Sequence, residues 1–239
     1  MKKRFISTLL TLAAAFTGSC LALEPVTEDF SAATLDGFRW FQFRAGKGRL
    51  QPANGKLNFT VPSKTPTIND FASLELLYNE ASTGENWEMI VDFSNIAKMK
   101  KHTGCGFMIF NAADRKDYIY VNYYSSYGID AGVFNNLNLA PAPPLSMRAV
   151  VPIGAVRVTY DLMTGLMTFF SSKNSKEEGY IWKTMGTFSP DSTGTADVVS
   201  NWGINGDGAF GFQLFGLASL NRVALGQVTI DNFSLQLLP

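Results

Sequence analysis

The sequence predicts an all-β protein, a two-sheet antiparallel β-sandwich of the jelly-roll type. Short runs rich in β-branched and aromatic residues follow one another along most of the chain, separated by Gly, Asn, Asp, Ser and Pro. No stretch has the 3.6-residue apolar period of an amphipathic helix. A series of short strands with turn signals between them is typical of antiparallel sandwiches.

The closing segment, Gly226 to Leu237, supports the same fold. Its apolar residues alternate along the segment, but Ile230 and Phe233 would face opposite sides of a regular strand. Either both faces of this strand are covered, or one extra residue near Asn232 shifts the phase. Both interpretations require a core between two sheets.

We expect strands wherever such runs occur. Their ranges are 38–44, 55–61, 71–78, 87–93, 104–110, 118–124, 131–134, 155–160, 166–171, 180–188, 210–215 and the closing segment.

Two of these segments carry the clearest local evidence. In 87–93, four apolar residues alternate with other side chains and are expected in the core: Trp87, Met89, Val91 and Phe93. The runs in 156–170 are expected to form a hairpin in which Gly165 adopts positive φ. By contrast, three prolines within 138–147 predict an extended loop rather than a ladder strand.

The first 22 residues are expected to be a secretory signal peptide. Three basic residues precede an apolar run over 6–16, and small residues follow. This run is too short to span a bilayer, and we expect no transmembrane segment elsewhere. The alternative is a lipoprotein signal at Cys20, but Thr17 stands where such signals normally carry Leu. The mature protein is thus expected to be secreted, periplasmic or on the cell surface.

Residues 23–239 are expected to form one domain. Cys105 is the only cysteine among them, so an intramolecular disulfide is excluded and the core alone must hold the fold. Removal of the basic leader turns an even balance of 20 basic and 20 acidic residues into a slight acidic excess. Nucleic acid is therefore not an expected partner, because phosphate binding needs a concentrated positive field.

At the level of fold, the chain resembles the concanavalin A-like lectin and glucanase sandwiches, which include laminin G-like modules and bacterial laminarinases and lichenases. The resemblance covers nearly all of the mature chain. It rests on these segments: 28–30 followed by Trp40, 54–59, the 156–170 hairpin, and 208–214 leading to 228–233.

The resemblance implies a structural Ca²⁺ on the convex side of the sandwich. Its ligands would be the carboxylate of Asp231, the carbonyl of Gly55 and a carbonyl near Glu28. The alternative is that Asp231 caps a turn or accepts backbone N–H groups without a metal. Zinc is not expected, because His102 is the only histidine.

The resemblance also raises the question of catalysis. Laminarinase-like members carry acidic residues at i, i+2 and i+4 of a strand on the concave face, whereas this chain has Glu88, Ile90 and Asp92. The two acids are separated by about 13 Å of strand rise, against the roughly 5 Å between carboxyl groups of a retaining pair. We therefore expect no catalytic residues, with Glu88 and Asp92 as the only weak candidates, on the same face as the 118–124 strand and opposite Asp231.

A glycan-binding site without catalytic activity needs the faces of aromatic rings, with amide groups nearby. Candidate ligand-binding residues lie on one face of the 118–124 strand, in the loops after it and at one separate tryptophan: Tyr118, Tyr120, Asn122, Tyr124, Tyr127, Asn135 and Trp182. Aromatics in a strand fit burial in a core equally well. The sequence thus favours a noncatalytic glycan-binding or cell-envelope protein; the alternatives are a divergent glycoside hydrolase or polysaccharide lyase, and a structural or protein-binding module.

Overall fold

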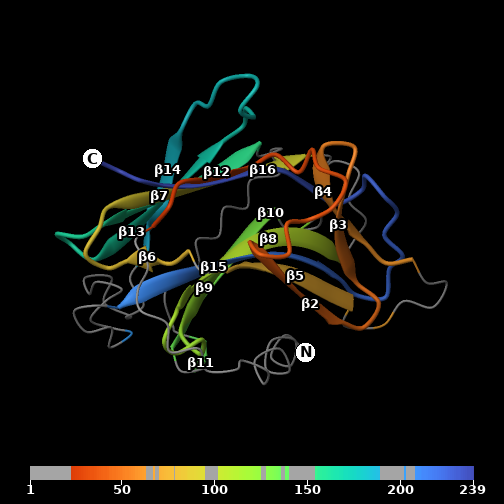
Figure 1. The fold of residues 1–239 in the computed structure, drawn as a ribbon, viewed down its shortest axis with the longest axis horizontal. Coiled ribbons are helices and arrows are strands. Elements are labelled where there is room, and N and C mark those ends of the chain that lie inside the picture. Colours follow the sequence, from red (N-terminus) through yellow and green to blue (C-terminus); the bar gives the residue numbers. More distant parts are fainter. Residues whose placement is uncertain are drawn as a thin grey trace.

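The structure, a computed structural model, describes residues 23–62, 67, 70–77, 79–94, 102–124, 128–135, 138–139, 154–188, 202 and 208–239. These residues form strands and no helix, and the strands make two antiparallel sheets packed face to face (Figure 1). The predicted all-β sandwich is confirmed. In the described part of the chain, no helix is long and apolar enough to cross a membrane.

Sheet A contains the closing strand and has the order β14-β13-β12-β7-β16-β4-β3, with β1 paired to β16. Its strands are β1 (Val26–Glu28), β3 (Arg49–Ala53), β4 (Lys56–Thr60), β7 (Trp87–Ser94), β12 (Ala155–Asp161), β13 (Leu166–Ser172), β14 (Lys183–Phe188) and β16 (Thr229–Leu237).

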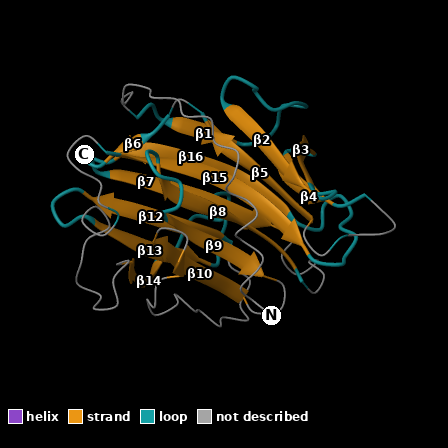
Figure 2. Cartoon of the chain, turned by 90° about the horizontal axis from the view of Figure 1, so that it is seen from below, coloured by secondary structure: helices purple, strands orange, loops and turns teal. Residues whose placement is uncertain are grey.

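Sheet B lies against it and has the order β11-β10-β9-β8-β15-β5-β2, with β6 paired to β15 (Figure 2). Its strands are β2 (Trp40–Ala45), β5 (Asp70–Leu76), β6 (Ala81–Ser82), β8 (Thr103–Asn111), β9 (Tyr118–Tyr124), β10 (Gly128–Asn135), β11 (Asn138–Leu139) and β15 (Ala209–Ala218). Neighbours in this sheet, such as β8 and β15, come from distant parts of the chain.

The core fills the space between the inner faces of the two sheets. The four alternating residues of β7 are buried in it, as predicted: Trp87, Met89, Val91 and Phe93. Trp87 stacks on Tyr160 of the same sheet at 5.6 Å and meets the ring of Phe212 of sheet B edge-on at 5.3 Å. Burial of each such side chain stabilises the fold by about 1.5–3 kcal/mol, so the core compensates for the missing disulfide.

The closing strand β16 contains a bulge. Its register against β7 shifts between Ile230 and Asn232, which leaves Asp231 as the extra residue. Ile230 and Phe233 are consequently both buried in the core, although a regular strand would separate them. Of the two interpretations of this strand, the extra residue is therefore the right one.

The predicted hairpin is confirmed: β12 pairs with β13, and Gly165 in their turn has a φ of 66°. The predicted loop over 138–147 needs a correction, because Asn138–Leu139 form the short strand β11 against the end of β10. This pair lies before the prolines, which explains why it can join the ladder; residues 140–147 lie outside the described residues. The sequence did not predict β1, β3 or β6, which are short or carry few apolar residues.

Candidate functional site

The two strands that carry most of the candidate residues lie in different sheets. Strand β7, with Glu88 and Asp92, pairs with β12 and β16 in sheet A, whereas β9 pairs with β8 and β10 in sheet B. The expectation that the acidic strand and the tyrosine strand share one face is therefore wrong. Both acids alternate with core residues and so lie on the outer face of sheet A, on the sheet that also carries Asp231.

Glu88 is engaged by its neighbours on sheet A. Its Oε2 accepts a hydrogen bond from Arg157 Nε at 2.7 Å, and its Oε1 accepts one from Gln236 Nε2 at 2.6 Å. The Arg157 guanidinium also lies over the ring of Phe170, 5.3 Å from its centroid. These contacts hold Glu88 in a cross-strand network that stabilises the sheet.

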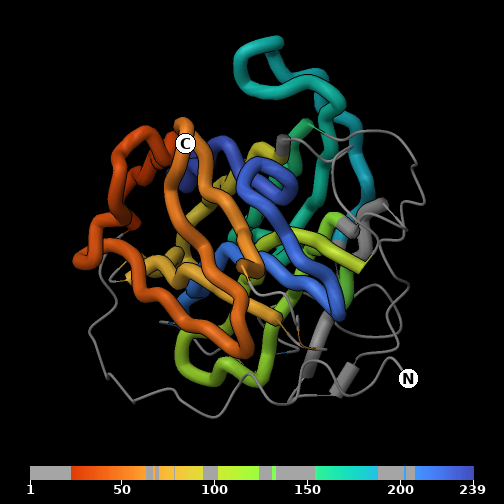
Figure 3. The backbone as a smooth tube through the Cα atoms, turned by 90° about the vertical axis from the view of Figure 1, so that its right-hand side faces the viewer, coloured from red at the N-terminus to blue at the C-terminus, as the bar shows by residue number. Residues whose placement is uncertain are grey.

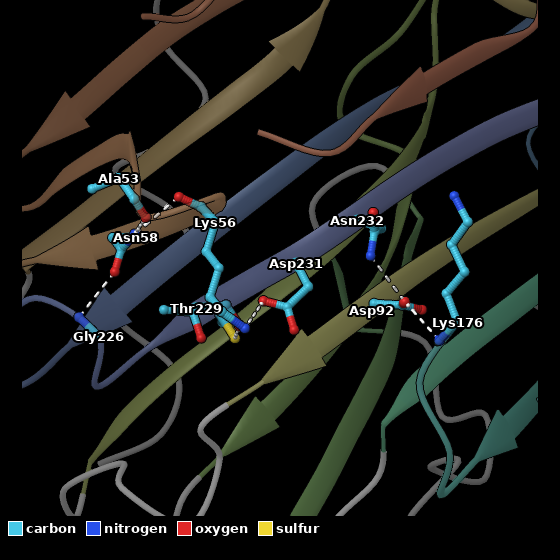
Figure 4. Close-up of polar contacts among 10 residues, drawn as sticks. Ala53, Lys56, Asn58, Asp92, Lys176, Gly226, Thr229, Asp231 and Asn232 are labelled. Carbon is cyan, nitrogen blue, oxygen red and sulfur yellow. Dashed lines mark hydrogen bonds and ion pairs between the residues drawn. The ribbon is translucent and has the colours of Figure 1, made fainter. Parts of the chain in front are cut away.

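Asp92 is fully buried beneath the segment that connects β13 and β14. Its carboxylate accepts hydrogen bonds from the Lys176 backbone N–H at 3.2 Å and from Asn232 Nδ2 at 3.3 Å (Figure 4). It also accepts one from Tyr180 Oη at 2.8 Å. Burial raises the pKa of Asp92 above its ordinary value, the three hydrogen bonds lower it, and the charge of Asp231 raises it. The contacts of Asp92 attach the β13–β14 connection to sheet A.

The acidic side chains at the proposed calcium positions are engaged in contacts within the protein. Oδ1 of Asp231 lies 2.6 Å from Nζ of Lys56, so a cation of the chain already neutralises this carboxylate (Figure 4). Gly55 lies in an exposed turn with a φ of 68°. The Glu28 carboxylate accepts hydrogen bonds from the Phe30 backbone N–H and from Trp40 Nε1. In the described part of the chain, no three acidic, histidine or cysteine side chains gather as metal ligands.

Glu28 instead borders a surface hollow of about 270 Å³. Phe30, Leu35 and Pro52 supply apolar walls, and Asp36 adds a second carboxylate. The Asp36 carboxylate accepts the backbone N–H of Phe38, which fixes the turn before β2. Both carboxylates thus organise the local backbone.

The alternation predicted for β9 is confirmed. Ile119, Val121 and Tyr123 belong to the core, so Tyr118, Tyr120 and Asn122 lie on the outer face of sheet B. Tyr118 and Asn122 are nevertheless only 3% and 5% exposed, whereas Tyr120 is partly exposed. The backbones of Tyr124 and Asn135 continue β9 and β10, and Tyr127 lies outside the described residues.

Tyr120 ends a row of side chains that crosses five adjacent strands. Register pairs Tyr120 of β9 with Met108 of β8, Met108 with Gln213 of β15, Gln213 with Glu75 of β5, and Glu75 with Phe41 of β2. We call these five residues the sheet B row. Four spacings between neighbouring strands give it a length of about 19 Å.

Most of the sheet B row is accessible. Phe41 is 53% exposed, and Gln213, Met108 and Tyr120 are partly exposed. The flanking positions are buried on both sides, with Phe215 and Asn122 on one side and Phe110 and Tyr118 on the other. The accessible part of this face is therefore a strip across the strands.

Polar groups accompany the aromatic ends of the row. Gln213 Nε2 donates to Ser73 Oγ at 2.9 Å, and Arg115 Nη2 donates to Oε1 of Glu75 at 2.6 Å. The Oδ1 of Asn122 is buried and has no hydrogen-bond partner within the described residues. A buried oxygen without a donor is costly for the fold.

Sequence reasoning missed four of the five members of the sheet B row: Phe41, Glu75, Gln213 and Met108. Each occupies an outward position in or beside a predicted strand, but these strands are far apart in the sequence. The alternation alone would have shown that each faces outward; the order of the strands was needed to place them side by side.

Trp182 is separate from the other ligand-binding candidates. Its ring packs 4.6 Å from that of Tyr180, which donates to Asp92 on the outer face of sheet A. Figure 3, like Figure 1, shows the connection between β13 and β14 projecting beyond the sheets. The structure therefore does not bring Trp182 together with β9. Trp202 is buried against Phe210, with the ring centroids 6.2 Å apart.

Comparison with known proteins identifies the fold. A scan against protein-family models matches none, and a search of curated proteins finds no match. Among solved structures, lectin UEA-II complexed with galactose is 12% identical, with 90% of this chain and 99% of that chain covered and a TM-score of 0.50. Lectin I from Ulex europaeus, in complex with the methyl glycoside of α-L-fucose, is 11% identical, with 89% and 96% covered and a TM-score of 0.51.

The carbohydrate recognition domain of Emp47p is likewise similar, at 11% identity, with 88% of this chain and 93% of that chain covered and a TM-score of 0.50. At these identities the similarity concerns the fold alone. The two antiparallel sheets, and the similarity to these structures over most of the chain, confirm the fold-level resemblance inferred from the sequence. The chain has the concanavalin A-like jelly-roll fold.

Proposed function

We propose that this protein binds carbohydrate, without chemical conversion, through the sheet B row. The observation that carries the proposal is the accessible strip of Phe41, Gln213, Met108 and Tyr120, in register across adjacent strands. The rings at its two ends offer apolar faces on which the C–H side of a sugar ring stacks. The amide of Gln213, which is partly exposed, supplies a partner for hydroxyl groups between them.

The length of the strip favours an oligosaccharide over a single sugar. A chain laid across the strands would meet side chains from five of them over about 19 Å. Asn122 lies two residues along β9 from Tyr120 and is buried, so it borders the strip without presenting its side chain to a ligand.

The similar solved structures support the class of ligand. Two of them are described with galactose or a fucoside, and the third as a carbohydrate recognition domain. We transfer to this chain only the general idea that such a sandwich presents a surface to a sugar. The proposed surface comes from the residues of sheet B.

We further propose that binding takes place outside the cytoplasm, after removal of residues 1–22. The basic, apolar and small-residue segments at the start of the sequence support this location. Binding is proposed to need no calcium, because Lys56 holds the carboxylate of Asp231.

A glycan array with purified residues 23–239, with and without a chelator, tests the proposal. Binding is expected in both conditions, and a reducing-sugar assay on the best hits should detect no released sugar. Release of sugar would contradict the noncatalytic role, and the absence of binding to any glycan would overturn the proposal.

Two substitutions locate the site. Tyr120→Ala and Met108→Ala should each weaken binding to the best hit, by about tenfold, because each removes contact area from the strip. Met163→Ala is the matched control for the methionine, since Met163 is 84% exposed in the β12–β13 turn of sheet A. If Trp182→Ala abolished binding and Tyr120→Ala did not, the site would lie on sheet A and the proposal would be wrong.

A further inference from the structure

The charges beside the sheet B row define which glycans it can accept. We infer that the ligand is a neutral oligosaccharide chain, and that Glu75 is a specificity determinant that excludes acidic glycans. This inference rests on the proposed function, because it concerns the same surface. Glu75 excludes acidic chains by occupying the arginine that would otherwise bind their carboxylate or sulfate groups.

Arg115 is a cation that contacts the sheet B row, and Glu75 forms an ion pair with it. Its two terminal nitrogens, Nη1 and Nη2, each donate to one carboxylate oxygen of Glu75, at 2.5 and 2.6 Å. The guanidinium also lies over the ring of Phe110, 5.0 Å from the ring centroid. Because its positive charge is already paired with a carboxylate, this guanidinium attracts a ligand anion less strongly than an unpaired one would.

The ion pair between Glu75 and Arg115 is partly buried, so a ligand cannot easily separate it. The side chain of Glu75 is only 10% exposed and that of Arg115 is 38% exposed. Partial burial strengthens the ion pair relative to an exposed one and makes its separation costly. A free uronate would therefore have to compete with an internal carboxylate that is already in place.

A second carboxyl group adds to the exclusion. Glu80 follows β5 and interacts electrostatically with both Arg115 and Glu75. Burial is the main cause that raises the pKa of Glu80, the charge of Arg115 lowers it, and the charge of Glu75 raises it. The charge of Arg115 thus acts on two carboxyl groups, although its hydrogen bonds go to Glu75, so the surroundings of Arg115 favour an approaching anion less.

A second positive charge in the loop that carries Arg115 is also paired with an acidic side chain. Its lysine, Lys116, lies 3.7 Å from the carboxylate of Asp114, and both side chains are about half exposed. Hydroxyl groups of a neutral sugar need only donors and acceptors, whereas a uronate or sulfate needs a cation that is free to bind it. Glu75 thus contributes to specificity by disfavouring acidic ligands rather than by binding neutral ones.

The test compares neutral and acidic oligosaccharides of equal length. Residues 23–239 are titrated by calorimetry with gluco-, manno- and galacto-oligosaccharides, and with oligomers of galacturonate and of alginate. We expect a neutral series to bind at least tenfold more tightly than either acidic series. Tighter or equal binding of an acidic series overturns this inference while leaving carbohydrate binding intact; no binding to any series overturns the proposed function itself.

Substitution of Glu75 tests the role of the pair directly. Glu75→Gln leaves Arg115 with a neutral partner and should raise the ratio of acidic to neutral affinity by about tenfold, since a charge-assisted hydrogen bond becomes available to the ligand. Arg115→Gln is the matched control: it removes the cation, keeps both carboxyl groups and should give no such gain. Both variants are compared with the unsubstituted protein by circular dichroism and thermal unfolding.

An unchanged ratio in folded Glu75→Gln would contradict the assigned role of Glu75. If Glu75→Gln did not fold, the milder Glu75→Asp would replace it. Its shorter side chain loosens the two-point contact with Arg115, so a smaller gain in acidic binding is expected, and no gain would contradict the role.

Discussion

The ammonium of Lys56 lies 2.6 Å from Oδ1 of Asp231, at the bulge of the closing strand. The bulged residue thus pairs its carboxylate with a cation that the neighbouring strand β4 supplies. An internal salt bridge thus stands where the fold resemblance implied a metal ion.

Lys56→Ala is expected to lower the free energy of unfolding by about 1 kcal/mol or less, because the lysine is about one third exposed and water screens the pair. Urea denaturation measures the change. Lys116→Ala removes an exposed partner of Asp114 and should have no measurable effect. A loss of several kcal/mol for Lys56→Ala would contradict this expectation.

A chelator is expected to leave the thermal unfolding midpoint of residues 23–239 unchanged, and added Ca²⁺ should not raise it. The reason is that Lys56 already neutralises Asp231, and the described residues offer no set of three acidic, histidine or cysteine ligands. Differential scanning calorimetry gives the readout. A midpoint that rises with Ca²⁺ concentration would show that a metal site exists.

Asp92 should make folding stability depend on pH. Burial raises its pKa in the folded state, so its contribution is fully present below the ordinary pKa of 3.8 and is lost as the pH rises through the folded-state pKa. Relative to Asp92→Asn, the unsubstituted protein should therefore lose stability as the pH increases across this window. Urea midpoints of both proteins at several pH values test this, and a difference independent of pH would refute it.

Tyr180→Phe is expected to enlarge that pH dependence, because the Tyr180 hydroxyl is the strongest of the groups that lower the pKa of Asp92 against the effect of burial. At neutral pH the variant should also lose about 1 kcal/mol of stability, the typical contribution of one hydrogen bond. The same urea series provides the measurement. If the Asp92 titration did not move, the hydroxyl would not be its dominant partner.

Gly132→Ala should weaken glycan binding more than it affects the fold. A Cβ at Gly132 would lie 2.6 Å from Cε1 of Tyr120, so the ring at the end of the sheet B row must move. Because this ring belongs to a partly exposed side chain, the displacement is cheap for stability. We expect about a tenfold loss of affinity with an unchanged circular dichroism spectrum; unchanged affinity would argue against Tyr120 as a contact.

Gly106→Ala should instead damage the fold. The added Cβ would lie 2.0 Å from the backbone oxygen of Val121 on the neighbouring strand, and the backbone there cannot yield without breaking the ladder. A loss of more than about 3 kcal/mol, or failure to fold, is expected. Gly37→Ala is the control, since a methyl group at that position would have nothing within 4 Å. A stable Gly106→Ala protein would contradict the packing of β8 against β9.

Much of the fold could be predicted because its signals are local. Alternation in 87–93 identified core residues correctly, Gly165 marked a hairpin, and the phase break near Asn232 made a bulge one of two interpretations of the closing strand. Each of these signals depends on side chains within a few positions of one another. Short strands such as β1 and β6 have too few residues to produce an alternation, so they were missed.

The candidate site could be predicted only in part. Outward orientation of Tyr118, Tyr120 and Asn122 followed from the alternation, but their burial did not, because it depends on what covers them. Glu88 offered no sign in the sequence that Arg157 would take up its carboxylate. The burial of these side chains and the partner of Glu88 both depend on how strands that are distant in the sequence pair and pack.

The sequence by itself thus determined most of the strands, their inward faces and the sandwich class, since these follow from periodicity and from the burial of apolar side chains. Tertiary structure alone decided that Phe41, Glu75, Gln213, Met108 and Tyr120 lie in one row and that Lys56 meets Asp231. The physical reason is that strand order depends on long-range pairing and packing, which are summed over the whole core and leave no local trace in any one segment.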